Sequence, residues 1–275
     1  MNAIQIPGIC DPEAAIEKKK EETKYRMVVE LEKGRLKIIP GSHKLDTNLY
    51  TEIQEIPESQ ICLMGKPVAD EDFDDSTDIH CDRCNSFYRS FCLRHPLYRI
   101  HDKIPQENDA HKSYAERTLP HLFKVANSSI PNAGMGVFAQ AFIPVGMVFG
   151  PYKGLRCTKK SEFFKDGYAW EVNGANGVFF IDGSHPDKSN WLRFINSPRD
   201  EKEQNMLAFQ VSGRIYYRVI KPILTDEELL VWYGDDYGTE YVYQVPSSTN
   251  PPPANKTSRK RNPFIWHPLG TPKHA

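Results

Sequence analysis

The sequence predicts a mainly β protein, and two observations between residues 119 and 243 lead to this prediction. Short apolar runs of strand-like composition follow one another there, separated at close intervals by Gly, Pro and Asn. Two further runs, Met206–Val211 and Arg214–Ile220, flank Ser212-Gly213, a two-residue turn of the type that closes tight β-hairpins. The other expected strands are Leu122–Val125, Gly136–Phe142, Met147–Phe149, Tyr168–Val172 and Val178–Ile181.

Composition agrees with a globular core that carries polar flanks. The chain has 275 residues and a net charge of −1, so its charge predicts no strong attraction to nucleic acid or to a membrane. No apolar run reaches the roughly 18 residues that span a bilayer. The N-terminus lacks the pattern of a secretory signal. We therefore expect a soluble intracellular protein with reduced cysteines.

The two flanks of the β-rich region are expected to be weakly ordered. Residues 1–78 read as an arm, with a solvated helix or disordered segment from Asp11 to Gly34 and an acidic linker over Asp70–Asp78. A role of the acidic stretch in attracting a basic partner is the alternative. Residues 246–275 read as a disordered, basic, Pro-rich tail, in which Lys256–Arg261 (KTSRKR) resembles a nuclear import signal.

A cysteine cluster predicts a small metal site at residues 79–98. The spacing Cys81-x2-Cys84-x7-Cys92-x2-His95 gives two tight turns, each of which directs two ligands at one point. Three thiolates and one imidazole suit a closed, tetrahedral, structural Zn²⁺ site, and metal binding would supply the folding energy of so short a segment. The alternative is a set of unrelated core cysteines beside a surface histidine.

Three segments of the β-rich region are unusual for a purely structural domain. The Gly-containing run 132–138 would let backbone approach a ligand closely. Asn190–Asn196, followed by Ser197-Pro198, looks like an aromatic-rich helical turn that ends in an amide side chain. The run from Glu228 to Tyr237 reads as a buried strand, Leu229–Tyr233, that stops at Gly234.

Taken in order, these motifs resemble the SET-domain lysine methyltransferases, and within them the PR-domain branch whose meiotic, histone-methylating member carries a zinc knuckle. The resemblance covers about residues 80–243 and implies a SET-type β-fold over 115–243, with a pseudoknot-like C-terminal segment. Besides the four zinc ligands and 133–137, the residues that carry it are Phe149–Gly154, Gly167–Trp170, Asp182-Gly183, Asn190–Asn196, Glu203–Asn205, Ala208–Gln210, Ile215–Arg218 and Leu229–Gly234.

The resemblance also implies roles for individual residues. Ala133, Gly134 and Met135 would bind S-adenosylmethionine along their backbone. Tyr168 would line the same pocket, and Asn196-Ser197 would contact the adenine side of the donor. Tyr152, Tyr217 and Tyr233 would form the lysine channel, with Tyr233 as the catalytic hydroxyl. Core packing with a bonded hydroxyl is the alternative for each tyrosine.

The implied activity is methylation of a histone tail, at the lysine of histone H3 nearest the N-terminus. The expected partners are the histone peptide and chromatin proteins, in the nucleus or alternatively in the cytoplasm, with neither sequence-specific DNA binding nor a membrane. Asn190-Trp191 stands where most SET enzymes have Asn-His, and a longer segment, 222–228, replaces their Pro-Gly turn. A rival interpretation is an inactive PR module that recruits chromatin proteins; a zinc-dependent nucleic-acid binder would need a basic face.

Overall fold

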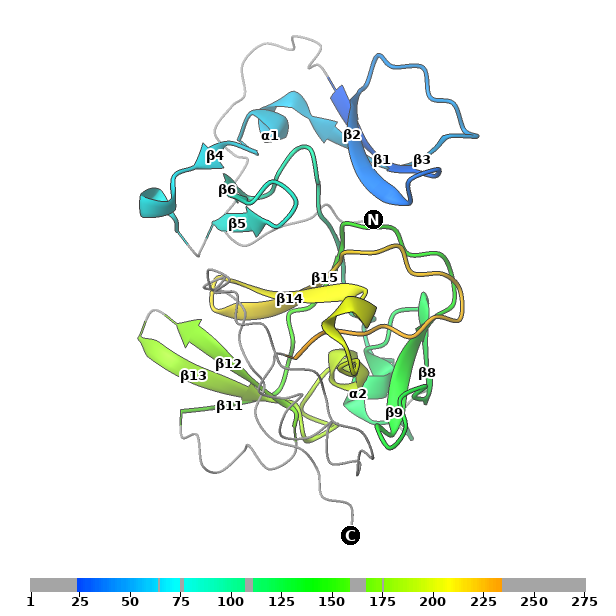
Figure 1. Ribbon diagram of the computed structural model, residues 1–275, viewed down its shortest axis with the longest axis vertical. Coiled ribbons are helices and arrows are strands. Elements are labelled where there is room, and N and C mark those ends of the chain that lie inside the picture. Colours follow the sequence, from blue (N-terminus) through cyan, green and yellow to red (C-terminus); the bar gives the residue numbers. More distant parts are fainter. Residues whose placement is uncertain are drawn as a thin grey trace, which may run out of the picture.

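Five small sheets and few helices make up the structure, which is a computed structural model (Figure 1). It describes residues 24–63, 65–74, 77–106, 111–158, 167–174 and 176–233. The expected tail 246–275 and the first part of the expected arm lie outside the described residues. The mainly β fold class is confirmed. No helix among the described residues is long and apolar enough to cross a membrane.

The central sheet contains the predicted hairpin and confirms its turn. Its strand order is β14 (Met206–Val211), β15 (Arg214–Val219), β10 (Met147–Phe149) and β7 (Tyr98–Ile100). Ser212 and Gly213 have φ angles of 50° and 62°, as a two-residue turn with the twist of a hairpin requires.

Two further sheets flank this one (Figure 1). Strands β8 (Phe123–Asn127) and β9 (Met135–Ala139) form a hairpin, and β11 (Leu155–Cys157), β13 (Gly177–Asp182) and β12 (Ala169–Gly174) form a three-stranded sheet. The sequence predicts all of these except β11, although the run beginning at Gly136 ends three residues earlier than expected. The short helices are α2 (Tyr114–Arg117), η3 (Trp191–Phe194) and η4 (Glu201–Glu203), so the expected helix over 190–196 is a 3₁₀ turn.

The last described segment is threaded between three others rather than paired as a regular strand. Leu229 N donates to Val137 O at 2.8 Å, and Val231 N donates to Asn196 O at 3.0 Å. Leu230 N donates instead to the Asn205 side-chain oxygen at 2.9 Å. Because each backbone group bonds to a different segment, the expected strand 229–233 consists of isolated bridges. This arrangement has the character of the expected pseudoknot.

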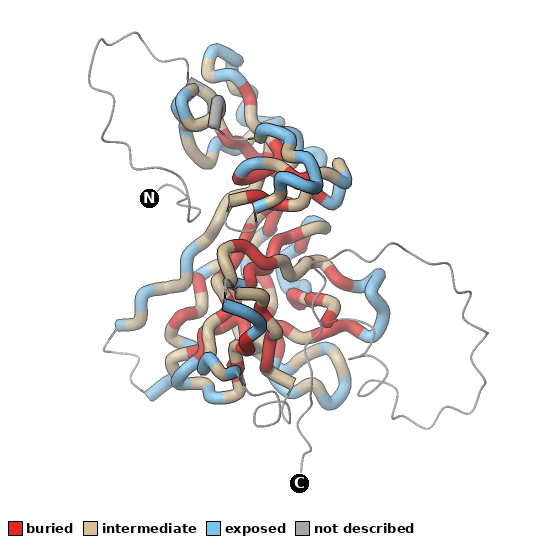
Figure 2. The backbone as a smooth tube through the Cα atoms, turned by 90° about the vertical axis from the view of Figure 1, so that its left-hand side faces the viewer, coloured by how far each residue is buried: buried red, intermediate tan, exposed pale blue. Residues whose placement is uncertain are grey.

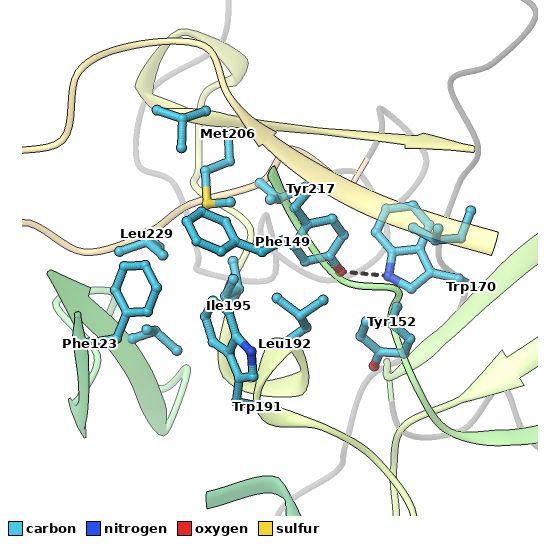
Figure 3. Packing of buried hydrophobic residues seen from close by; sticks show 14 of the residues in the cluster. Phe123, Phe149, Tyr152, Trp170, Trp191, Leu192, Ile195, Met206, Tyr217 and Leu229 are labelled. Carbon is cyan, nitrogen blue, oxygen red and sulfur yellow. Dashed lines mark hydrogen bonds between the residues drawn. The ribbon is translucent and has the colours of Figure 1, made fainter. Parts of the chain in front are cut away.

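An aromatic core holds these sheets together (Figure 3). Phe123 stacks on Trp191 with ring centroids 5.0 Å apart, and Phe149 meets both rings edge-on. Burial of a large apolar side chain contributes roughly 1.5–3 kcal/mol. Figure 2 shows buried stretches in both the upper and the lower part of the molecule, which indicates a second core outside the central one.

That second core corrects the expectation for the N-terminal arm. Residues 24–63 form an antiparallel sheet of β1 (Lys24–Glu30), β2 (Arg35–Pro40) and β3 (Tyr50–Pro57), followed by α1 (Glu58–Leu63). The prediction of a solvated helix or disordered arm is wrong here. The apolar residues are too sparse for a core of their own, but they gain a partner outside the segment, Phe91, in a cluster with Met27, Val29, Leu36 and Ile56.

The acidic stretch is likewise not simply a linker. Its first residues form the 3₁₀ turn η1 (Asp70–Asp72), and its last begins β5 (Asp78–Cys81), which pairs with β6 (Ser86–Arg89) beside β4 (Pro67–Val68). The Asp78 side chain is buried and pairs with Arg89 Nε at 2.9 Å. Asp78 Oδ2 also accepts from the backbone of Asp74 at 3.0 Å. These contacts compensate the buried charge, which is why an acidic residue can begin this strand.

Candidate functional site

The four predicted metal ligands lie together at the end of β5 and in the turns around β6. Their ligand atoms all lie within 4.8 Å of one another. His95 Nδ1 lies 3.4 Å from the sulfurs of both Cys81 and Cys84 and 3.8 Å from that of Cys92, and the Cys84 and Cys92 sulfurs are 3.7 Å apart. A tetrahedron with zinc–sulfur bonds of about 2.3 Å has edges of about 3.5–3.8 Å, so the cluster fits a Zn²⁺ ion.

The metal cluster is attached to the central sheet by one buried arginine. Arg218, on β15, donates through Nη1 to His80 O at 2.8 Å and through Nη2 to the Asp82 carboxylate, between the first two cysteines. Burial lowers the pKa of Arg218, and the charge of Asp82 opposes that shift. The chain also continues from His95 into β7, which pairs in parallel with β10. A cleft of about 60 Å³ lies at this junction.

The bend predicted to bind the methyl donor lies between β8 and β9. Gly134 has a φ angle of +76°, and a Cβ built there would meet nothing within 4 Å, so the bend borders open space. Met135 is 43% exposed beside it, whereas Ala133 is half-buried. Exposed backbone next to an open space fits a ligand held through main-chain groups, as the predicted roles require.

Asn196 connects this bend to the threaded segment. Its Nδ2 donates to Met135 O at 2.9 Å, and its backbone oxygen accepts from Val231 N. The neighbouring Ser197 is 8% exposed, and its hydroxyl accepts from Tyr233 N at 3.1 Å. The structure thus brings Asn196 and Ser197 to the bend on one side and to Tyr233 on the other.

The three predicted channel tyrosines belong to one series of neighbouring aromatic rings. Tyr152 and Tyr217 have ring centroids 6.2 Å apart, and Trp170 lies between Tyr217 and Tyr233 at 5.9 Å and 5.6 Å. Figure 3 shows the Trp170 indole nitrogen directed at the Tyr217 hydroxyl, a hydrogen bond of 2.7 Å. Trp170 belongs to one of the motifs that carry the family resemblance, but the sequence predicts no role for this ring between Tyr217 and Tyr233.

Each phenol also has a partner within the protein. The Tyr152 hydroxyl donates to Tyr168 O at 2.8 Å, and the Tyr233 hydroxyl donates to Ile195 O, next to Asn196. Burial raises the pKa of Tyr217 well above its ordinary value, and Tyr152 nearby adds to the shift. Burial likewise raises the pKa of Tyr152. Both phenols therefore stay neutral near pH 7 and act through hydrogen bonds.

Tyr168 lies beside Tyr152 and Arg193. Its ring is covered by the Arg193 guanidinium at 4.4 Å, and its backbone oxygen binds the Tyr152 hydroxyl. Arg193 is itself fixed by donating to Gly183 O at 2.8 Å. No described contact joins Tyr168 to 133–135, so its predicted place in the donor pocket stays a prediction.

Asp102 explains the Asn190-Trp191 pair, and sequence reasoning missed it. Its carboxylate accepts from Trp191 Nε1 at 3.1 Å, from Asn190 Nδ2 and from Lys153 Nζ at 2.8 Å. The pair is therefore bonded within the fold and positions the segment that carries Tyr152. A single aspartate in a polar stretch, 51 to 89 residues before its partners, gives no local signal.

Comparison with known proteins is consistent with this arrangement. The family model described as PR domain zinc finger protein 2, PR domain, matches residues 123–244. Histone-lysine N-methyltransferase set-17 of Caenorhabditis elegans is 49% identical over 266 residues, which cover 96% of this chain and 94% of that protein. Human histone-lysine N-methyltransferase PRDM7 is 37% identical over 165 residues, 59% of this chain and 33% of its own length.

Among solved structures, the methyltransferase domain of human PR domain-containing protein 2 is 35% identical and has a TM-score of 0.42. It matches 50% of this chain and 90% of its own. The similarity to set-17 extends along almost all of both chains. This chain therefore belongs to the PR/SET family of histone-lysine N-methyltransferases.

Proposed function

We propose that this protein transfers methyl groups from S-adenosylmethionine to a histone tail, at the lysine of histone H3 nearest the N-terminus. The observation that carries the proposal is the pair of contacts made by the neighbours Ile195 and Asn196. The Asn196 side chain bonds to the 133–135 bend, and the Ile195 backbone oxygen accepts from the Tyr233 hydroxyl. Two adjacent residues thus set the position of the proposed donor-binding backbone relative to the proposed catalytic phenol.

The reaction requires little chemistry from the protein. S-adenosylmethionine, when bound, supplies a methyl group on a positively charged sulfur. The lysine nitrogen must attack as a neutral amine, and burial beside Trp170 and the tyrosines would lower its pKa from about 10.4. The new N–C bond would form as the S–C bond breaks, and the methylated nitrogen would then lose its proton to water. Because the Tyr152 and Tyr217 phenols are neutral, these two side chains would orient the amine rather than remove its proton.

The Cys81, Cys84, Cys92 and His95 cluster is proposed to bind one structural Zn²⁺ ion. Four protein ligands would fill a tetrahedral coordination sphere and leave no position open for catalysis. The proposed location is the nucleus, with chromatin proteins as partners. The import-like segment 256–261 lies outside the described residues.

A second candidate function is a PR module that binds chromatin proteins without turnover. The protein partners of all three phenols favour it, because a core tyrosine would have the same bonds. Mass spectrometry of histone H3 peptides incubated with the protein and S-adenosylmethionine separates the two. Methylation of a peptide that keeps only the first lysine, absent when that lysine is arginine, supports the proposal. Methylation at another lysine would correct the proposed site. If no peptide is methylated, the result favours a PR module that binds chromatin proteins without turnover.

A further inference from the structure

Glu228 is a buried carboxylate to which neither the fold nor the reaction described above assigns a role. It is 7% exposed and lies at the start of the threaded segment. Four donors from two distant regions converge on it. Ser128 Oγ and Asn196 Nδ2 donate to Oε1 at 2.7 and 3.1 Å, and Ser129 donates to Oε2 through its backbone N at 2.8 Å and through its hydroxyl.

We infer that Glu228 is a positioning residue for the methyl donor, because it fixes the Asn196 amide and the 128–135 loop against each other. The inference rests on the proposed function, since it takes the 133–135 bend as the donor site. Glu228 itself acts through these neighbours, and the inference assigns it no contact with the donor or the lysine.

The carboxylate determines which way the Asn196 amide faces. An amide nitrogen has two hydrogens, and both are used, one by Glu228 Oε1 and the other by Met135 O. The amide oxygen could not face Glu228, because two acceptors would then oppose each other without a hydrogen. Glu228 thereby keeps the Asn196 side-chain nitrogen hydrogen-bonded to the carbonyl oxygen of Met135. Met135 is the last residue of the bend proposed to bind the methyl donor.

The same carboxylate anchors the beginning of that loop. Ser128, whose hydroxyl binds Glu228, also donates its backbone N to Gly134 O at 2.8 Å. Its hydroxyl oxygen accepts from Ile130 N at 3.0 Å. The loop is thus closed on itself at Ser128 and Gly134, and Glu228 holds it at both ends, through Ser128 and through Asn196.

The packing at Gly136 shows that this place is built around the carboxylate. A Cβ at position 136 would lie 2.2 Å from Glu228 Oε1 and 3.3 Å from Asn196 Nδ2. No side chain larger than hydrogen fits there while Glu228 occupies its position. From the sequence, Gly136 is expected only to let the backbone approach a ligand closely. The structure shows instead that Gly136 lets β9 approach the buried carboxylate of Glu228.

The test compares Glu228→Gln with Glu228→Asp and with the matched control Glu227→Gln. The glutamine has the shape of glutamate, but its amide group cannot accept hydrogen bonds at both ends. The neighbouring Glu227 is exposed, and its side chain accepts a local bond from Leu224 N at 2.8 Å. Calorimetry with S-adenosylmethionine gives the dissociation constant, and steady-state kinetics separate the KM of the donor, the KM of the peptide and kcat.

We expect Glu228→Gln to weaken donor binding by about 10- to 100-fold, as for loss of hydrogen bonds to a buried charged group. The KM for the peptide should stay within about twofold, Glu228→Asp should recover part of the affinity, and Glu227→Gln should match the wild type. Unchanged donor affinity in a folded Glu228→Gln protein overturns the inference. So does an equal rise in both KM values, which a merely structural role would produce.

If Glu228→Gln does not fold, Ser128→Ala decides the question. This variant removes one hydrogen bond to the Glu228 carboxylate and leaves the hydrogen bonds from Ser129 and Asn196 in place. Donor affinity several-fold weaker with unchanged peptide KM supports the inference, and unchanged donor affinity contradicts it. A wild-type protein that binds no donor defeats the proposed function as a whole; donor binding that survives in Glu228→Gln defeats only the role of Glu228.

Discussion

The metal cluster and the tyrosine site are assembled in opposite ways. The four metal ligands lie within 15 consecutive residues, in turns around one short hairpin. The proposed tyrosine site draws on backbone or side chains of residues 133–135, 152, 168–170, 196–197, 217 and 233, and the last segment joins it by lying beside Asn196. The first depends on local spacing and a metal, and the second on the topology of the whole domain.

This difference predicts different responses to single changes. A lost ligand should remove the local fold of residues 79–98, because the proposed Zn²⁺ ion would supply its stability. A lost side chain in the tyrosine site should leave the fold intact and change one step of the reaction. The four predictions below test this contrast, from the largest expected effect to the smallest.

Replacement of Cys92 by serine should abolish zinc binding. Structural zinc sites contribute about 10 kcal/mol or more to folding, so residues 79–98 should become sensitive to proteases. Metal content measured by inductively coupled plasma mass spectrometry should fall from one zinc per chain to none. Cys157→Ser, outside the cluster, is the control and should keep its zinc. Full zinc content in Cys92→Ser would show that the cluster is not the site.

Removal of the Tyr233 hydroxyl should lower turnover without loss of fold or of donor binding. Tyr233→Phe keeps the ring next to Trp170 and loses the hydrogen bond to Ile195 O. We expect kcat to fall by about 100- to 1000-fold, as when one preorganised donor is removed from an active site. Tyr216→Phe, in which a hydroxyl without a described partner is lost, is the matched control. Equal turnover in wild type and Tyr233→Phe would remove the catalytic role of this phenol.

The junction between the two regions should respond asymmetrically to its two partners. Asp82→Asn leaves the buried guanidinium of Arg218 without its counter-charge, which should lower the free energy of unfolding by about 3 kcal/mol. Arg218→Met should cost about 1 kcal/mol, because the Asp82 side chain, 36% exposed, can be hydrated. Urea unfolding measures both, with Arg214→Met on the exposed end of the same strand as control. An equal cost for both changes would mean that burial of Arg218 does not govern this contact.

The buried tyrosines should make the protein lose stability at high pH. Burial raises the pKa of Tyr152 and of Tyr217 in the folded state, so both stay protonated where the unfolded chain ionises near pH 10. Stability is complete below that pH and should fall by about 1 kcal/mol per tyrosine between pH 10 and pH 11. Tyr152→Phe should reduce the slope of the unfolding free energy against pH. If Tyr152→Phe and the wild type had the same slope of unfolding free energy against pH, burial of the Tyr152 phenol would be contradicted.

The sequence was sufficient where structure is local. Ser212-Gly213 predicts a hairpin because only a few residue types suit positive φ at both central positions, and the cysteine spacing predicts a cluster because two turns fix two pairs of ligands. The ordered motifs also point to the tyrosines and Asn196, through resemblance rather than through any local pattern, and the roles of these residues stay predictions.

What could not be predicted depends on distant partners. Met27 and Leu36 look too sparse for a core, but the structure places them in one cluster with Phe91. The sequence pattern therefore predicts a weakly ordered arm over residues 1–78. Glu228 looks like an ordinary surface acid before an apolar run, and its burial needs two serines about 100 residues away. A one-dimensional pattern contains neither contact.

The central claim is that Asn196, with its neighbours Ile195 and Ser197, joins the proposed donor-binding bend to the proposed catalytic Tyr233. Calorimetric titration of the purified, zinc-loaded protein with S-adenosylmethionine tests it most directly, with Asn196→Ala alongside. The account predicts one donor bound per wild-type chain and at least about tenfold weaker binding in the variant. No binding to the wild-type chain, or equal binding to both proteins, would contradict it.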